Sequence, residues 1–176
     1  FLVSLMEDTS KNMVLCGKSP LMDFIKSPFL FNKSLIELHG WKNIISKMTE
    51  NYPEILIDLI DDMGGKNIFV KKSEKKIDTL RRISFVIYSC DKDKFIKDFG
   101  LIRRKAKELL SEDIENNYLE KEIFLIMRMF FLRFSHDCVM QMIRDLWPII
   151  FIKLIQNILK NDPLLVTETF KFIELL

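Results

Sequence analysis

Glycine and proline are scarce in this sequence, since each occurs only five times among 176 residues. Proteins built from many short strands need both residues at their tight turns, so this scarcity argues against a turn-rich β fold. Phenylalanine and methionine are plentiful instead, and hydrophobic residues make up 48% of the chain. Such a composition suits helices with apolar inner faces and predicts an all-α fold with a sizeable core.

The sequence also lacks close cysteine pairs, a long apolar run and a dominant charge. Cys16, Cys90 and Cys138 are odd in number and widely spaced, which argues against a disulfide framework or a zinc site and indicates a reducing compartment. The most apolar stretch, Leu146 to Ile152, is far shorter than the roughly 20 residues that cross a bilayer. With no secretory leader and a net charge of +2, we expect a cytoplasmic protein that does not bind nucleic acid.

Residues that would carry catalysis are few and poorly placed. His39 and His136 lie in no His-Glu-x-x-His pattern, which excludes a zincin-type site. The segment from Gly64 to Lys66 resembles the end of a phosphate-binding loop but lacks the earlier glycine and the following Ser or Thr. The run from His136 to Cys138 predicts no Cys-His pair, because adjacent side chains on a helix point in different directions. We therefore expect no catalytic residue, cofactor or metal, and we expect that the chain is not an enzyme.

Apolar residues recur at helical spacing along most of the chain. The clearest stripe alternates spacings of four and three, and it comprises Phe95, Phe99, Ile102, Ala106 and Leu109. Comparable stripes cover 77–87 and 123–134. We expect the break at 90–93 to join the helix of 77–87 to the helix that carries the Phe95 stripe, so that the two form an antiparallel hairpin. We expect a turn over 139–143, after which Pro148 begins a helix that runs to Lys160. Further helices are expected at 39–51, at 53–63 and from Asp162-Pro163 onward.

These helices predict a single helical domain over residues 1–176. Within it, 1–26 is expected to hold poorly defined N-terminal helices and a loop, and 27–176 a stack of helical hairpins. Because each helix is apolar on one broad face, each pair can bury that face against the next, as in HEAT or armadillo solenoids. No clean repeat of about 40 to 47 residues is visible, so we expect an irregular stack, with a globular bundle as the alternative. Helical patterns at both ends predict a fragment of a much larger protein.

Seven cations gather in residues 66–82, where they face only Glu74 and Asp78. They are Lys66, Lys71, Lys72, Lys75, Lys76, Arg81 and Arg82. Each exposed cation beside an anionic membrane contributes about 1 kcal/mol, so this segment is a candidate site for phosphoinositide headgroups. A solvated helix face is the alternative explanation. Nucleic acid fits less well, because the aromatic residues lie on the apolar stripes rather than between the cations.

Two further features are candidates for binding. A second group of cations would extend the first if the hairpin brought them together, and it comprises Arg103, Arg104, Lys105 and Lys107. Trp147, immediately before Pro148, is a candidate interface anchor because Trp is favoured at binding hot spots. Core packing at the start of a helix is the alternative role for this indole.

Three parts of the chain share a pattern of packing residues with one known family. The first part holds Ser27-Pro28-Phe29-Leu30-Phe31 and Trp41-Lys42-Asn43-Ile44-Ile45. The second runs from Leu80 to Ser89 and continues through Asp93 and Phe95 into a basic helix. The third runs from Phe124 to Arg133 and then from Leu146-Trp147-Pro148 to Leu159. In order and spacing these residues resemble the C-terminal region of Dopey-family proteins.

The resemblance implies a very large cytosolic scaffold that is peripherally attached to Golgi and endosomal membranes and acts in membrane traffic. It also implies several partners, namely a large scaffold related to Arf exchange factors, a phospholipid flippase, kinesin light chain and phosphoinositides. No residue signature for these partners can be carried over to this chain. After Leu159 the chain departs from the family pattern, because Asn161-Asp162-Pro163 leads directly into another helix where family members have a variable insertion.

Overall fold

The computed structural model describes residues 22–23, 25–26, 35–63, 72–112 and 116–175. Within these ranges all regular structure is helical, which confirms the predicted fold class. In chain order the elements are α3 (Leu35–Asn51), α4 (Ile55–Asp62), α5 (Lys72–Ser89), the 3₁₀ helix η3 (Ile96–Asp98), α6 (Phe99–Ser111), α7 (Asn117–Arg133), α8 (His136–Leu159) and α9 (Pro163–Ile173). Most of the expected N-terminal region, 1–26, lies outside the described residues.

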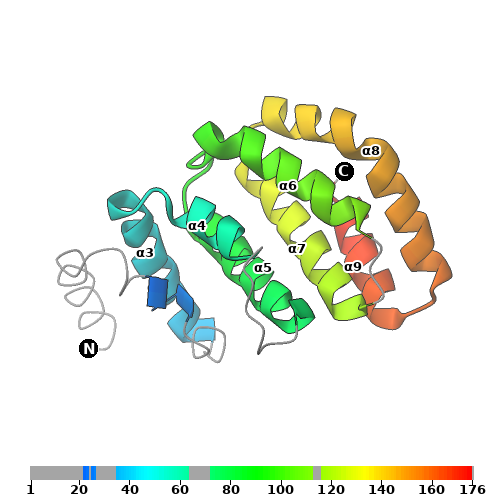
Figure 1. Ribbon diagram of the computed structural model, residues 1–176, viewed down its shortest axis with the longest axis horizontal. Helices are drawn as coiled ribbons and strands as arrows, with labels where there is room; N and C mark the ends of the chain where they lie inside the picture. Colours follow the sequence, from blue (N-terminus) through cyan, green and yellow to red (C-terminus); the bar gives the residue numbers. More distant parts are fainter. Residues whose placement is uncertain (1–21, 24, 27–34, 64–71, 113–115, 176) are drawn as a thin grey trace.

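The helices form two layers of a stack (Figure 1). In one layer α3, α5, α7 and α9 lie side by side, each packed on the next, and α4, α6 and α8 form the other layer. Arg81 of α5 bonds to Glu122 of α7, and Arg133 near the end of α7 donates to the carbonyl of Tyr88 near the end of α5. These two bonds show that α5 and α7 run parallel. Every second helix is therefore a neighbour in the same layer, as in a solenoid of helical pairs.

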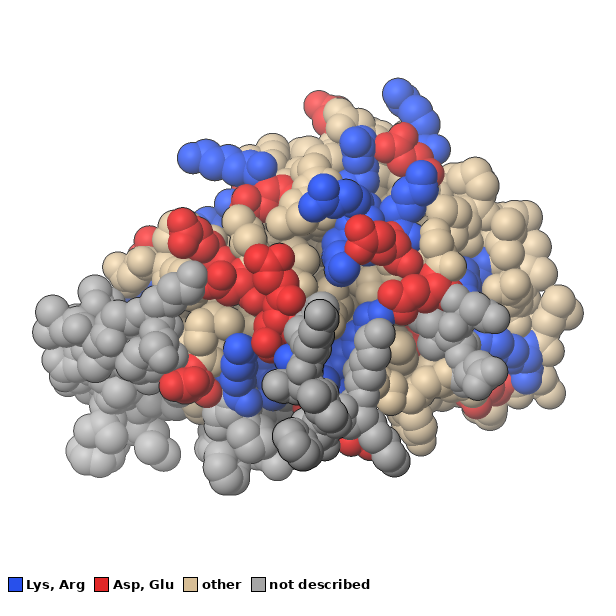
Figure 2. Space-filling view, in the orientation of Figure 1, with Lys and Arg blue, Asp and Glu red and all other residues tan. Residues whose placement is uncertain are grey.

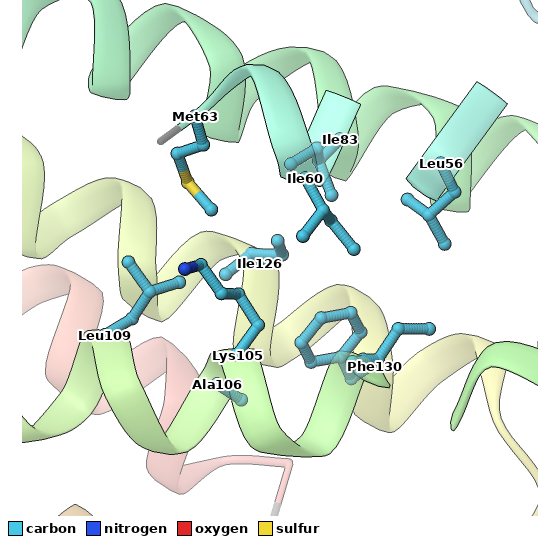
Figure 3. A pocket seen from close by; sticks show the side chains of 10 residues that line it. Leu56, Ile60, Met63, Ile83, Lys105, Ala106, Leu109, Ile126 and Phe130 are labelled. Atoms are coloured by element: carbon cyan, nitrogen blue, oxygen red, sulfur yellow. The ribbon is translucent and has the colours of Figure 1, made fainter. Parts of the chain in front are cut away.

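The expected pairing of 77–109 as a hairpin is only partly right: α6 follows α5 in the chain, but the two helices are not each other's main packing partners. α5 packs most extensively on α7, and α6 lies across them on the side of α4. Figure 3 shows how side chains from four helices converge at this point, with Ile60, Ile83, Ala106 and Ile126 each coming from a different one. The space left between them is only about 10 Å³, and because its lining is apolar except for Lys105 it offers an ordered water molecule few polar partners. The layers are therefore closely packed.

The predicted apolar stripes form the core of the stack. All five residues of the clearest stripe are buried, although Phe95 precedes η3 and the α-helix itself begins at Phe99. Aromatic rings join neighbouring helices, because Phe172 of α9 makes edge contacts with Phe124 and Phe131 of α7 at centroid distances of 5.6 and 5.2 Å. Such edge-to-face pairs contribute roughly 0.5–1.5 kcal/mol beyond the burial of their area.

The expected turn over 139–143 is wrong, because α8 is one helix of 24 residues with Pro148 in its interior. Met142, Leu146, Ile150 and Leu154 are all buried, so a stripe of spacing four continues through the proline. Proline lacks the amide that would bond to the carbonyl of Arg144 and costs a helix interior about 3 kcal/mol. Figure 1 shows that α8 bends midway, which is the expected response to that missing bond. Burial of one continuous apolar face outweighs the local preference of proline.

Two helices begin with side-chain caps, and the cap of α9 also bonds to the first residue of α7. Asn116 accepts hydrogen bonds from the amides of Tyr118 and Leu119, and Asp162 accepts from those of Leu164 and Leu165. The second carboxylate oxygen of Asp162 also accepts from Asn117 at 2.9 Å. The predicted start of a helix at Asp162-Pro163 is confirmed, with Pro163 in the first turn, where proline is favoured.

Candidate interaction surfaces

Ionisable residues in the described part of the chain do not gather into a catalytic constellation. No group of three or more His, Cys, Asp and Glu residues there is placed to hold a metal ion. His136 and Asp137 lie exposed in the first turn of α8. Cys90 is buried at 3.3 Å from the hydroxyl of Thr49, and burial raises the pKa of its thiol.

The candidate lipid-binding segment lies mostly on α5, and two of its lysines, Lys75 and Lys76, take part in α5's contacts with its neighbours. Lys75 pairs with Asp62 at the end of α4 at 3.2 Å. Lys76 donates to Glu112, just after α6, at 2.6 Å. Lys66 and Lys71 lie outside the described residues, and Lys72 begins α5.

The two arginines of the segment also have partners within the chain. Arg81 donates to Glu122 of α7 at 2.8 Å, and Arg82 donates to the carbonyls of Ile25 and Lys26 at 3.1 and 3.0 Å. Burial lowers the pKa of Arg82, an effect that Asp78 and Asp62 oppose. All four cations with described side chains thus hold helices together, and lipid binding by this segment stays a prediction.

The second group of cations lies on α6 among carboxylates. Arg103 pairs with Asp145 of α8 at 2.8 Å, and Lys105 pairs with Glu108 at 2.6 Å. Figure 2 shows that acidic side chains gather over α4 and that positive and negative side chains alternate over α6. This face of the stack therefore carries mixed charge rather than one continuous basic surface.

Trp147 lies on the outer face of α8 with 41% of its surface exposed, and its ring is 6.0 Å from that of Phe151. Other large apolar side chains are exposed further along the same helix, namely Ile152, Ile155, Ile158 and Leu159. At 100° per residue these positions cover one continuous arc of α8, opposite Leu146 and Ile150. We name this arc, from Trp147 to Leu159, the α8 stripe. The role of Trp147 as an interface anchor stays a prediction.

Sequence reasoning missed a groove between α5 and α7, on the outer face of their layer. One face of α5 lines it with Arg81, Ser84, Phe85 and Tyr88. α7 contributes Lys121, Glu122, Leu125 and Met129. The groove has a volume of about 530 Å³. The α5 residues of the groove recur at spacings of three and four, which in the sequence indicates a second helix face. The other face of the same helix is more strongly apolar, and sequence analysis identified only that one.

The layered fold and its surfaces define an α-helical stack protein. The chain belongs to the DOP1 C-terminal family, whose profile matches residues 2–168, and this confirms the expected resemblance to the Dopey family. It is similar to the Protein DOP1 homolog of Drosophila melanogaster, with 24% identity over 160 residues. That match covers 86% of the chain but 6% of the relative, so the chain spans only a small part of that protein.

Two further findings concern the structure. No solved structure matches this chain. Among the described residues, none of the helices combines the length and the apolar character that spanning a membrane requires.

Proposed function

We propose that this chain is a contact-making segment of a large Dopey-like scaffold that acts in Golgi and endosomal membrane traffic. Membership of the DOP1 C-terminal family supports the scaffold. The observation that supports contact-making is the α8 stripe, which exposes two large aromatic rings and several aliphatic side chains on one helix face. Contiguous exposed apolar surface of this kind marks sites where proteins associate.

The chemistry of the α8 stripe suits burial against a protein partner. Burial of apolar surface contributes about 25 cal/mol per Å², and aromatic side chains dominate the energetics of interfaces. Lys160, at the end of the helix, already pairs with Glu120 at 2.7 Å. The resemblance to the Dopey family suggests the large scaffold related to Arf exchange factors as the first partner to examine, before the flippase and kinesin light chain.

The test is binding of the purified chain to that purified scaffold, measured by surface plasmon resonance. Phe151→Asp should weaken binding at least about tenfold, because it places a charge in the centre of the buried surface. Ile96→Asp is the matched control, since Ile96 is 46% exposed but lies in η3, outside the α8 stripe. If the chain does not bind while a longer piece of the protein does, the segment has a structural role and the proposal fails.

A second candidate function is peripheral binding of anionic membranes through residues 66–82, and the density of cations there favours it. Vesicle flotation with and without phosphoinositide tests it at low salt, where electrostatic attraction is strongest. Lys66→Glu with Lys71→Glu should reduce recovery and leaves the four internal pairs intact. Lys94→Glu with Lys97→Glu, two exposed residues at and beside η3, gives the same change of charge outside both groups of cations and should leave recovery unchanged. Equal recovery with neutral vesicles would exclude this function.

A further inference from the structure

The groove between α5 and α7 contains two buried polar atoms without a hydrogen-bond partner among the described residues. These are the hydroxyl oxygen of Ser84, on a residue that is 4% exposed, and one carboxylate oxygen of Glu122, on a residue that is 2% exposed. The other oxygen of Glu122 accepts from Arg81 at 2.8 Å. Buried polar atoms are nearly always bonded, and leaving one unbonded is costly. The two atoms together can accept a hydrogen bond and donate another.

Positive charge surrounds the groove at both ends. Arg81 and Lys121 lie at one end, and at the other the charged groups of Lys42 and Arg133 lie 5.1 and 5.2 Å from the centre of the Tyr88 ring. Against these four cations the described lining of the groove has one carboxylate, that of Glu122, so this set of five residues has a net charge of +3. Asp78 lies one helical turn before Arg81 and interacts with Arg82. An occupant with flanking carboxylates is therefore favoured electrostatically.

The floor and length of the groove indicate the shape of the occupant. Leu125 and Met129 lie between the charged ends, and α7 exposes Tyr118 and Leu132 on the same face. From Arg81 to Tyr88 the groove follows two turns of helix, a length of roughly 10 Å. An amphipathic helix uses apolar side chains of about two turns to dock in such a groove.

We propose that the groove between α5 and α7 binds an acidic amphipathic helical segment of a protein partner. Its apolar side chains lie against Leu125 and Met129, and its carboxylates lie beside Lys121 and Arg133. One uncharged polar side chain bonds to Ser84 and Glu122. This inference rests on the proposed role of the chain in protein contacts, but it concerns a different surface from the α8 stripe. A lipid acyl chain fits less well, because it offers no hydrogen bond to either buried atom.

The test uses the 176-residue chain and two synthetic helical peptides of about 14 residues, labelled with a fluorophore. Both peptides carry the same leucine stripe and one asparagine within it, and they differ only in having Glu or Lys at the flanking positions. Fluorescence anisotropy should show that the acidic peptide binds at least about tenfold more tightly than the basic one. Similar affinities for the two peptides would overturn the proposal.

Three substitutions locate the binding to the groove. Lys121→Glu should weaken the acidic peptide about fivefold, whereas Lys107→Glu, the same charge change on α6, should leave the affinity unchanged. Ser84→Ala should weaken the peptide about threefold without lowering the unfolding midpoint, since it removes a hydroxyl that has no partner among the described residues. A merely structural role for Ser84 would change the midpoint and not the affinity. Equal weakening by Lys107→Glu would also overturn the proposal.

Two more measurements separate this inference from its alternatives. If Leu125→Glu abolished flotation with phosphoinositide vesicles while neither peptide bound, the groove would be a lipid site and the proposal would be wrong.

The large scaffold related to Arf exchange factors serves as the second probe. If this scaffold bound the chain and lost affinity with Phe151→Asp, but neither peptide bound, the proposed function would stand and the groove proposal would fail. If that scaffold did not bind to the chain while the acidic peptide did, the groove proposal would stand and the proposed function would fail.

Discussion

The carboxylate of Asp93 accepts a hydrogen bond from the backbone amide of Ser135 at 2.6 Å. The amide of Asp93 in turn donates to the carbonyl of Arg133 at 2.8 Å. These two bonds tie the loop after α5 to the loop between α7 and α8. Asp93 has a φ of 61°, a left-handed conformation that Asp and Asn tolerate better than most residues. One residue thus fixes both its own turn and the start of α8.

We expect Asp93→Ala to lower the free energy of unfolding by about 2–3 kcal/mol, through loss of the charged hydrogen bond and strain at positive φ. Asp93→Asn keeps an acceptor and the left-handed preference, so its cost should stay below about 1 kcal/mol. Urea denaturation followed by circular dichroism measures both. Equal costs for the two variants would show that the bond to Ser135 contributes little.

Arg128 and Glu168 form an ion pair at 2.5 Å between α7 and α9, and both side chains are largely buried. Arg128→Met leaves the Glu168 carboxylate with Lys171, at 2.9 Å, as its one ion-pair partner among the described residues, and should cost about 2–3 kcal/mol. The double variant Arg128→Met with Glu168→Met should recover most of that loss, because no buried charge then lacks its partner. Guanidinium denaturation of the three proteins compares them. A double variant no more stable than the single one would contradict this account.

Pro148→Ala should raise the stability of the chain by roughly 1–3 kcal/mol, because it restores a helical hydrogen bond to the carbonyl of Arg144. Pro163 is the matched control, since it is also exposed but lies in the first turn of α9. Pro163→Ala should therefore change stability by less than about 0.5 kcal/mol. Thermal melts decide the comparison. A lower melting temperature for Pro148→Ala would mean that the bend in α8 is required for its packing on α6 and α9.

Leu146 and Trp147 are neighbours in sequence on opposite sides of the boundary between core and surface. Leu146 is fully buried, so Leu146→Ala should cost about 3 kcal/mol. Trp147→Ala should cost less than about 1 kcal/mol, because Trp147 is 41% exposed and its ring pairs with Phe151 on the same helix. Denaturation midpoints measured side by side provide the comparison. A large loss with Trp147→Ala would assign that residue to the core.

Acid should weaken the start of α9 through Asp162. Hydrogen bonds from the amide of Leu165, and also from Asn117 and Leu164, hold the pKa of this carboxyl below its usual value. The stabilisation is therefore complete above the unfolded pKa of about 3.9 and is lost as the pH falls below it. Asp162→Asn retains a capping oxygen that does not titrate, so its melting temperature should fall less between about pH 4 and pH 2. Parallel pH profiles for both proteins would contradict this assignment.

The helical stripes and several helix starts could be predicted from the sequence because they depend on local spacing. The stripe from Phe95 to Leu109 and the cap at Asp162 are of this kind. The continuity of α8 could not be predicted from the sequence, because a proline at position 148 is a strong local signal for a helix start. Only the tertiary burial of Leu146 and Ile150 on either side shows that the helix continues.

The partners of the cations were beyond sequence reasoning for a similar reason. Lys76 meets Glu112, which is 36 positions away, and Arg81 meets Glu122, which is 41 positions away. A list of charges in a segment therefore overstates how many remain for a ligand. The groove between α5 and α7 was missed because it exists only where these two helices pack in parallel.

In the stack, every substantial contact joins helices that are no more than two positions apart along the chain. A change at α9 therefore reaches α3 mainly through α7 and α5, and each step weakens it. Ligands held at distant points of the stack would consequently bind with little thermodynamic coupling. A segment with this connectivity can hold several partners at once without one regulating another.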